Sequence, residues 1–362
     1  MKKKTTFLSV FFLVLILILI GAYNLPYFRR YIDTCIFASD KYTCYTNNTH
    51  SVLSRKGVNE LFLYIDQVVV PNNNYALVHL VLHDTGELIY NKERNIQRTM
   101  NYAIALIKKH TKRGDIYFEG FDGYLHGAII AYFQDINVKQ QSIDKKIEDL
   151  CGLNKNQETI NKDEFECYHI VGHGLTNYFQ SDVAKASDLC DTFEGEAAKG
   201  GCYMGVFMEN AFLYSKTYHP DLLRKFVMGK SMALVCERFT KAKHKSCSHL
   251  VPTSYFINNP LDTKGAINEC KKLTNDYGAC IVGIAVIHIP SIYEGNFAKM
   301  KGACNATGED TKALCYGYVA RALYLGLGGE NYTKTDFCKL IPEGDRILCS
   351  SYKYNDRHEV NE

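Results

Sequence analysis

The chain has 362 residues, of which 46% are hydrophobic and 22% are charged, a mixture typical of folded globular proteins rather than disordered ones. Lysine and arginine total 42 against 39 acidic residues, and the net charge of +3 gives no electrostatic reason to expect a nucleic-acid partner. There is no tryptophan, but there are 14 cysteines, an even number that is high for a cytosolic protein. The length leaves room for two domains, or for one elongated repeat domain with an additional segment.

The N-terminal segment predicts a membrane anchor. Residues 5–23 carry no charge and consist mostly of Phe, Leu, Val and Ile, a length that just spans a bilayer as a helix. A cleaved signal peptide is the alternative, although its apolar region is usually shorter, about 7–15 residues. The three lysines in residues 1–4 outnumber Arg29 and Arg30 on the far side. The positive-inside rule therefore predicts a cytoplasmic N-terminus, a single-pass signal anchor and an extracytoplasmic body in which disulfides can form.

The cysteines fall into seven neighbouring pairs with a regular spacing. Their sequence separations within a pair run from 9 to 16, and none forms a C-x-x-C motif of the kind found in zinc ribbons. The first members Cys236, Cys270, Cys304 and Cys338 each lie 34 residues apart, and the second members follow at 33, 35 and 34. A fixed period of 34 is typical of helix–turn–helix repeat arrays.

The residues around the cysteines predict that each repeat is a helical hairpin. An apolar or amphipathic segment precedes the first cysteine, polar turn residues lie between the two, and an apolar segment with small residues follows the second. A disulfide within each hairpin would close a loop of about ten residues and stabilise it by roughly 3 kcal/mol. Bridges between successive repeats are the alternative. The pairs expected within hairpins are Cys35–Cys44, Cys151–Cys167, Cys190–Cys202, Cys236–Cys247, Cys270–Cys280, Cys304–Cys315 and Cys338–Cys349.

The Cys-loop-Cys-x-x-Gly arrangement, as in Cys202-Tyr-Met-Gly205 and Cys280-Ile-Val-Gly283, resembles the disulfide-stapled Sel1-like repeat proteins, cysteine-rich relatives of tetratricopeptide arrays. The resemblance covers residues 151–349 and implies an all-α solenoid or curved superhelix of α-α hairpins. The chain departs from that family in its longer loops and in the missing glycine after Cys167 and Cys247. It also resembles uncharacterised membrane-anchored prokaryotic proteins with His-Gly and Cys-Tyr-His motifs, which imply no known activity.

The N-terminal half is less regular. Residues 58–69 and 74–90 read as helices separated by a Pro-Asn-Asn-Asn turn, although 61–65 has a strand alternative. Residues 98–111 and 123–134 read as two further helices. The predicted organisation is therefore a cytoplasmic tail (1–4), the anchor (5–23), an irregular helical region (24–149), a cysteine-stapled helical repeat array (150–352) and a C-terminal tail (353–362).

Five of the twelve histidines recur in similar apolar, glycine-containing contexts. His79 and His83, like His169 and His173, are four residues apart, which places both rings of a pair on one helix face. His126 precedes a glycine, and Glu209 places a carboxylate in the helix of the repeat that follows His169 and His173. Two imidazoles at this spacing suit one metal ion. The predicted metal ligands are His79, His83, His126, His169 and His173, with Glu209 as a ligand or catalytic base.

Imidazole and carboxylate ligands suit Zn, Fe, Cu or Mn. The alternative is that these are buried histidines hydrogen-bonded to the backbone or to one another. In an open array, helices two repeats apart lie about 20 Å apart, so His79 and His169 would share a site only if the N-terminal half curls over the array. His249 lacks a histidine four residues later, and His219 and His244 are expected in loops or on the surface.

Two functions follow from these patterns. The first is a membrane-anchored binding scaffold that holds a protein, a peptide or a cell-envelope polymer, because solenoids present long concave surfaces. The second is a metal-dependent hydrolytic or oxidative enzyme that uses the histidines and Glu209. The fold class alone does not separate them.

Overall fold

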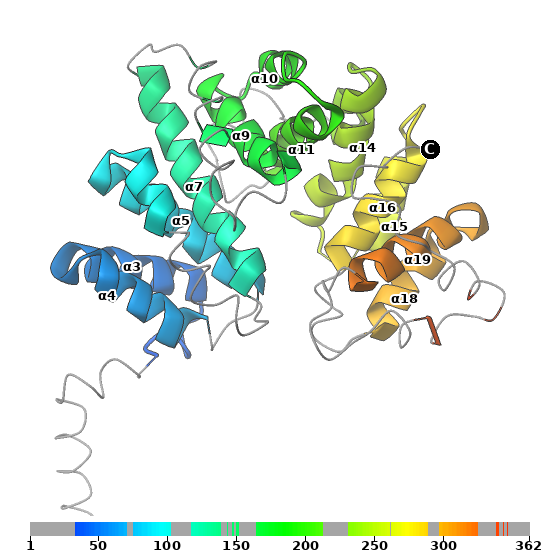
Figure 1. Ribbon diagram of the computed structural model, residues 1–362. Coiled ribbons are helices and arrows are strands. Elements are labelled where there is room, and N and C mark those ends of the chain that lie inside the picture. The colour runs from blue at the N-terminus through cyan, green and yellow to red at the C-terminus, as the bar shows by residue number, and fades with distance from the viewer. Residues whose placement is uncertain are drawn as a thin grey trace, which may run out of the picture.

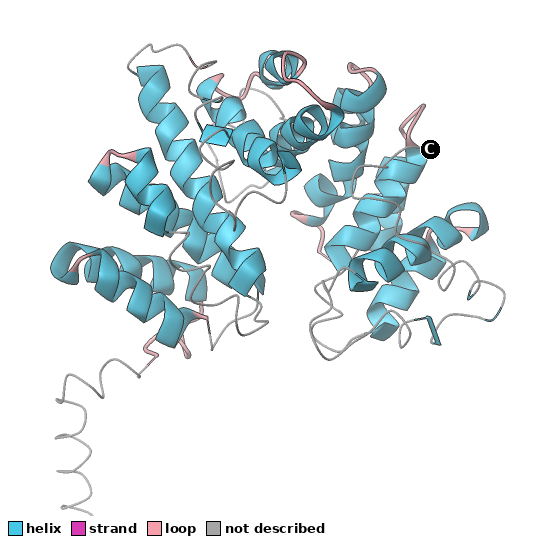
Figure 2. Ribbon diagram, viewed as in Figure 1, coloured by secondary structure: helices cyan, strands magenta, loops and turns pink. Residues whose placement is uncertain are grey.

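The computed structural model describes residues 33–70, 75–102, 117–138, 143, 147, 150–151, 164–212, 231–260, 262–288, 297–324, 338–339, 343 and 346. Within these residues every regular element is a helix and no strand is present (Figure 2). The predicted all-α class is confirmed for this part of the chain.

The N-terminal helices are α3 (Lys41–Lys56), α4 (Val58–Tyr64), the π-helix η1 (Ile65–Val69), α5 (Tyr75–Glu93) and α7 (Tyr117–Val138). The helices that follow are α9 (Glu164–Tyr178), α10 (Val183–Cys190), α11 (Glu196–Phe212), α13 (Met232–Cys236), α14 (Lys241–Phe256), α15 (Thr263–Cys270), α16 (Tyr277–His288), α18 (Phe297–Ala306) and α19 (Glu309–Tyr324). The helices predicted over 58–69, 74–90 and 123–134 are confirmed for the described residues, and the one predicted over 98–111 is confirmed for 98–102, the rest lying outside the described residues. The strand alternative for 61–65 is wrong, because α4 continues directly into η1 there.

Aspartate side chains begin three of these helices. The Asp40, Asp182 and Asp262 carboxylates each accept a hydrogen bond from the backbone N–H three residues later, at the starts of α3, α10 and α15. Such a cap satisfies one of the backbone donors that a helix leaves without an intrahelical partner, and it is worth about 1 kcal/mol. The short helices α10 and α15, with eight residues each, therefore have a defined start as well as a disulfide near their end.

The long helices form a continuous row (Figure 1). α5 packs on α7, α7 on α9, α9 on α11, α11 on α14, α14 on α16 and α16 on α19. The short helices α10, α13, α15 and α18 each pack against the long helix that follows them in the chain. The buried apolar side chains form one connected core that extends from α3 to α19. This row of paired helices agrees with the predicted hairpin array, while the solenoid shape itself stays a prediction.

The disulfides follow the predicted neighbour pairing. Six bridges join Cys35–Cys44, Cys151–Cys167, Cys190–Cys202, Cys236–Cys247, Cys270–Cys280 and Cys304–Cys315. Cys349 lies outside the described residues, so its pairing with Cys338 stays a prediction. Bridges of this number indicate an oxidising, extracytoplasmic compartment, because cytosolic thiols are kept reduced.

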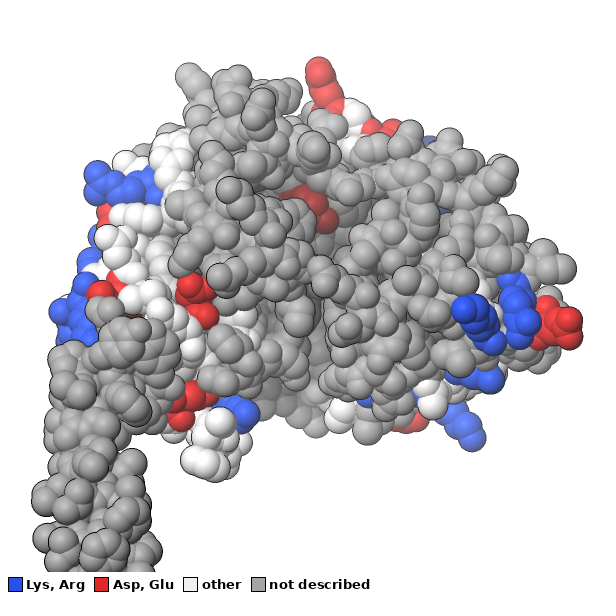
Figure 3. All heavy atoms as spheres, turned by 60° about the horizontal axis from the view of Figure 1, so that its bottom comes forward, with Lys and Arg blue, Asp and Glu red and all other residues white. Residues whose placement is uncertain are grey.

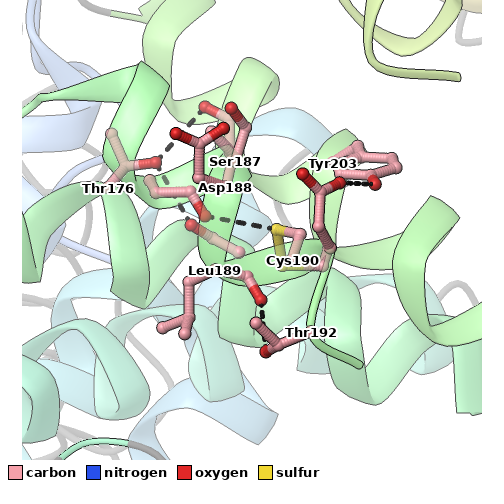
Figure 4. The surroundings of a disulfide bond; sticks show 12 residues. Thr176, Ser187, Asp188, Leu189, Cys190, Thr192 and Tyr203 are labelled. Carbon is pink, nitrogen blue, oxygen red and sulfur yellow. Dashed lines mark hydrogen bonds between the residues drawn. A yellow bond between two sulfur atoms is a disulfide. The ribbon is translucent and has the colours of Figure 1, made fainter. Parts of the chain in front are cut away.

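Four disulfides, from Cys190–Cys202 to Cys304–Cys315, each join a short helix to the long helix after it. α10, α13 and α15 end at their first cysteine, and α18 ends two residues beyond Cys304. The long helices begin three or six residues before the second cysteine, somewhat earlier than predicted. Figure 4 shows one such corner, where Tyr203 of α11 donates a short hydrogen bond to Asp191 beside Cys190.

The predicted membrane anchor lies outside the described residues, as do the two tails. Among the helices of the described part, none has the length and apolar character needed to cross a bilayer. On the face drawn in Figure 3, basic and acidic side chains of the described residues are both visible.

Candidate metal centre

Glycines set the close packing of the helices that carry the histidines. A Cβ atom added to Gly127 of α7 would lie 1.8 Å from the His83 carbonyl oxygen of α5. A Cβ atom added to Gly205 of α11 would lie 1.8 Å from the His169 carbonyl oxygen of α9. No side chain fits at such distances, so these helices cross with their backbones almost in contact. The histidines beside each crossing are thereby held on inward-facing turns.

The other four predicted histidines lie around His126. α7, which carries His126, packs against both α5 and α9, as Figure 1 shows. The His126 ring centroid lies 5.5 Å from that of His79 and 6.5 Å from that of His83. The corresponding distances are 5.5 Å to His169 and 4.4 Å to His173. The N-terminal half need not curl over the array, because α7 lies between the two histidine-bearing helices and both of them reach it.

Three of these histidines form a group that can hold a metal ion. His126, His169 and His173 each offer a ring nitrogen, and these atoms all lie within 4.8 Å of one another. The three side chains are buried, with exposed fractions of 4%, 8% and 2%. The Nε2 atoms of His169 and His173 are 3.3 Å apart. Two imidazoles on a tetrahedral zinc ion, with Zn–N bonds of about 2.0–2.1 Å, place their nitrogens about 3.3 Å apart.

Glu209 orients one member of the group from α11. Its Oε2 lies 3.0 Å from His173 Nδ1, and its Oε1 accepts a hydrogen bond from Asn177 Nδ2 at 3.2 Å. A carboxylate can only accept, so Nδ1 of His173 carries a proton, and the neutral form of the ring presents the lone pair of Nε2 to the group. Carboxylate–histidine pairs of this kind orient metal-ligating imidazoles in many proteins. The position of Glu209 is that of a residue supporting a ligand, and its predicted role as a catalytic base stays a prediction.

Several buried ring nitrogens of these histidines have no hydrogen-bond partner. In the described part of the chain, Nε2 of His126, Nδ1 of His169 and Nδ1 of His83 are buried and have no hydrogen-bond partner. A buried polar atom without a partner costs roughly 1–3 kcal/mol. Without a metal, the Nε2 of His169 must donate to the lone pair of His173. With a metal, both Nε2 atoms and a ring nitrogen of His126 can turn their lone pairs to the ion, whereas Nδ1 of His169 and of His83 gain no partner from it.

Burial keeps His83, His126 and His169 neutral. Desolvation is the largest cause that lowers the pKa of His126 and of His169 well below 6.5, and the neighbouring imidazoles lower both further. The pKa of His83 is lowered to about 4, mainly by burial, with the Glu209 carboxylate acting in the opposite direction. Neutral imidazole is the form that binds metals, so the site is prepared for an ion at neutral pH without losing protons first.

His79 and His83 stand at the edge of the group. Both rings approach His126. The three-membered metal group nevertheless contains neither of them. In addition to burial, the charge of His79 helps to lower the pKa of His169. Apart from burial, the pKa of His83 is raised by Glu209 and lowered by His173. The structure therefore divides the five predicted ligands into three with ligand geometry and two that surround them.

The prediction that His244 lies in a loop or on the surface is wrong. His244 lies in α14 with an exposed fraction of 4%. Its Nδ1 is 2.7 Å from the Asp276 carboxylate and its Nε2 is 3.3 Å from Glu237. Polar residues dominate the sequence around His244, and only the packing of α14 against the neighbouring loops buries it. His219 lies outside the described residues.

Asn177 is the member of the site that sequence reasoning missed. Its side chain donates both to the His173 carbonyl oxygen, at 3.2 Å, and to Glu209. It lies four residues after His173, and so on the same helix face, which is the signal that could have found it. No protein-family model, no curated protein and no solved structure matches the chain. The likeness to Sel1-like repeats therefore stays a prediction, and the site is interpreted from its own geometry.

Proposed function

We propose that this protein is an extracytoplasmic helical scaffold with a transition-metal ion bound by His126, His169 and His173. One observation carries the proposal: the two Nε2 atoms of His169 and His173 lie 3.3 Å apart while Glu209 holds the far nitrogen of His173. Without an ion this contact is a single N–H···N hydrogen bond, whereas a shared ion uses the lone pairs of both nitrogens. Three imidazoles suit Zn, Cu and Fe better than Mn, which prefers oxygen ligands.

The scaffold part of the proposal rests on the row of packed helices and on the disulfides. Residues 5–23 serve as the single-pass anchor, with the N-terminus in the cytoplasm, as their uncharged composition suggests. The body then presents its helical surface to a protein, a peptide or a cell-envelope polymer, in the manner of a solenoid. In this proposal the metal joins α7 to α9 and stabilises the scaffold where it binds, by preferring the folded state.

The alternative proposal is a metal-dependent hydrolytic or oxidative enzyme. One observation favours it: a group of three imidazoles leaves at least one coordination position for water or substrate, as catalytic zinc sites do. The hydrogen bonds to both Glu209 oxygens weigh against a free base at that residue. Azide binding to the cobalt-loaded protein distinguishes the two. A change in the cobalt spectrum on azide addition supports an open position, and an unchanged spectrum supports a closed structural site.

Elemental analysis of the protein purified from an oxidising compartment tests the proposal. We expect one equivalent of a transition metal in the wild type and its loss in His169→Ala and in His173→Ala. His249→Ala is the matched control, since His249 also lies two residues after the second cysteine of a pair, on α14. Retained metal in the two site variants, or a wild type that is metal-free and does not bind added Zn²⁺ or Cu²⁺, would contradict the metal site.

A further inference from the structure

Two neighbouring apolar side chains stand out from the surface of the described residues. Phe37 has an exposed fraction of 97%, and Ile36 has 45%. The other exposed large apolar residues of the described part, Leu234 and Leu314, lie singly on α13 and α19. Single exposed apolar residues are ordinary on proteins. An almost fully exposed phenylalanine beside an exposed isoleucine suggests contact with something outside the fold.

The loop that carries this pair is built rigidly. Cys35 and Cys44 form a disulfide with a Cα–Cα distance of 5.7 Å, and Cys35 is fully buried. Asp33 accepts hydrogen bonds from the Cys35 backbone N–H, at 2.8 Å, and from the Tyr45 hydroxyl. At its other end, Asp40 caps α3 through the Thr43 N–H. The two apolar side chains are therefore presented on a fixed support, so binding through them orders little additional chain.

The position of the loop in the chain indicates what it contacts. Residues 24–32 are all that separate the uncharged stretch 5–23 from Asp33. The ten Cα–Cα steps from residue 23 to residue 33 reach at most about 35 Å when extended. A bilayer that holds residues 5–23 is therefore always within that distance of the loop. Arg29 and Arg30 in the connecting residues favour an anionic membrane surface.

We propose that Ile36 and Phe37 form a lipid-contacting knob that inserts into the interfacial region of the membrane in which residues 5–23 are anchored. This inference rests on the proposed anchor. Apolar and aromatic side chains partition into the boundary between headgroups and acyl chains, and a covalent anchor keeps them at high local concentration there. The knob places the α3 end of the row of helices, blue in Figure 1, at the membrane, while α19 forms the other end of the row.

The absence of tryptophan from the sequence makes a direct test possible. Phe37→Trp gives the full-length chain a single tryptophan at the knob, at a position where the larger ring meets no packed neighbour. The variant is reconstituted into vesicles of phosphatidylcholine and phosphatidylglycerol, with and without brominated acyl chains. We expect tryptophan emission at shorter wavelength than in water and a loss of intensity in the brominated vesicles. The matched control is Leu314→Trp, which places the only tryptophan at an exposed apolar position on α19 and should show neither effect.

The outcomes separate the knob from the anchor. Protein that does not float with the vesicles contradicts the anchor itself. If the Phe37→Trp protein floats, but its tryptophan emission stays like that of a water-exposed indole and is not quenched, the knob is overturned. Emission at short wavelength without quenching by brominated lipid also overturns it, because a protein surface then covers the residue. Emission at short wavelength with quenching, absent in the Leu314→Trp control, confirms it.

Discussion

Two pairs of neighbouring helices, α9–α11 and α14–α16, cross in the same way. The first helix of each pair carries a histidine two residues after a disulfide cysteine, His169 or His249. The second carries a glycine three residues after its cysteine. A Cβ added to Gly205 would lie 1.8 Å from the His169 carbonyl oxygen, and one added to Gly283 would lie 1.9 Å from that of His249. The backbone geometry is thus repeated along the row of helices.

The side chains one turn further along differ. Four residues after His169 comes His173, whereas four residues after His249 comes Thr253. In the partner helices, Glu209 occupies the position that Ile287 has relative to its glycine. The comparison teaches that the helix crossing is a general device of the scaffold. The candidate metal centre requires the additional histidine, its supporting carboxylate and the approach of His126 from α7.

The glycine crossings allow the strongest test of this comparison. In Gly205→Ala and in Gly283→Ala the new Cβ would meet a backbone carbonyl, which cannot rotate away as a side chain can, so the helices must separate. We expect each variant to lose about 3 kcal/mol of unfolding free energy, measured by denaturant titration. Only Gly205→Ala should also lose metal.

Gly302→Ala is the control for these variants. A Cβ at Gly302, inside α18, meets no atom within 4 Å, so alanine should stabilise by about 0.5–1 kcal/mol through its better helix propensity. Wild-type stability in Gly205→Ala would show that the close crossing is not required.

Removing a disulfide should also distinguish the α9–α11 region from the α14–α16 region. Replacing both cysteines of Cys151–Cys167 or both of Cys270–Cys280 by serine should cost about 3 kcal/mol in either case, because each bridge restricts the unfolded chain. Metal affinity should fall only in the first variant, since Cys167 lies on α9 two residues before His169. Thermal unfolding and a competition titration with a metal-binding dye measure the two effects. Equal loss of affinity in both variants would mean that the site responds to global stability alone.

The supporting carboxylate should have a smaller effect. Glu209→Gln keeps the shape of the side chain but removes its charge, so His173 is oriented less firmly and its lone pair is less basic. We expect metal affinity to drop about 10- to 100-fold, as substitutions of residues that support a metal ligand typically do. Ile287→Gln, at the corresponding position of α16, is the matched control and should leave metal affinity unchanged. An unchanged affinity in Glu209→Gln would contradict the role assigned to the carboxylate.

Acid sensitivity should arise in both regions. Burial is the main cause that lowers the pKa of His83, His249 and His288 to about 4 in the folded protein. The unfolded chain takes up these protons near pH 6.5, so the stability they confer is complete above that pH and is lost as the pH falls towards 4. Each histidine contributes a slope of about 1.4 kcal/mol per pH unit in this window.

Denaturant titrations of the metal-free protein between pH 7 and 4.5 measure this slope. His249→Gln should remove the contribution of one histidine from the slope of unfolding free energy against pH, while leaving metal binding intact. His83→Gln should lower the slope by the same amount. A slope that neither substitution changes would show that other groups cause the acid sensitivity.

Local sequence patterns predicted much of the fold. The seven short cysteine intervals predicted the pairing, because residues 9–16 apart at the ends of a helical hairpin are neighbours whatever the rest of the chain does. Hydrophobic periodicity predicted the helices over 58–69 and 123–134, because it depends only on residues one or two helical turns apart. The spacing of four residues placed His169 beside His173, which the 3.3 Å contact confirms.

What the sequence by itself determined, then, was most of the helices, although not α3, together with the six described disulfides and the pairing of histidines within a helix, since all of these depend on residues close together in the chain. Only the tertiary structure decided that α5, α7, α9 and α11 pack in an order that gathers the histidines around His126. It also decided that His244 is buried and that Asn177 supports Glu209. These outcomes depend on which helices touch and how closely their glycines let them approach, and no local pattern specifies contacts between residues 30 to 90 positions apart.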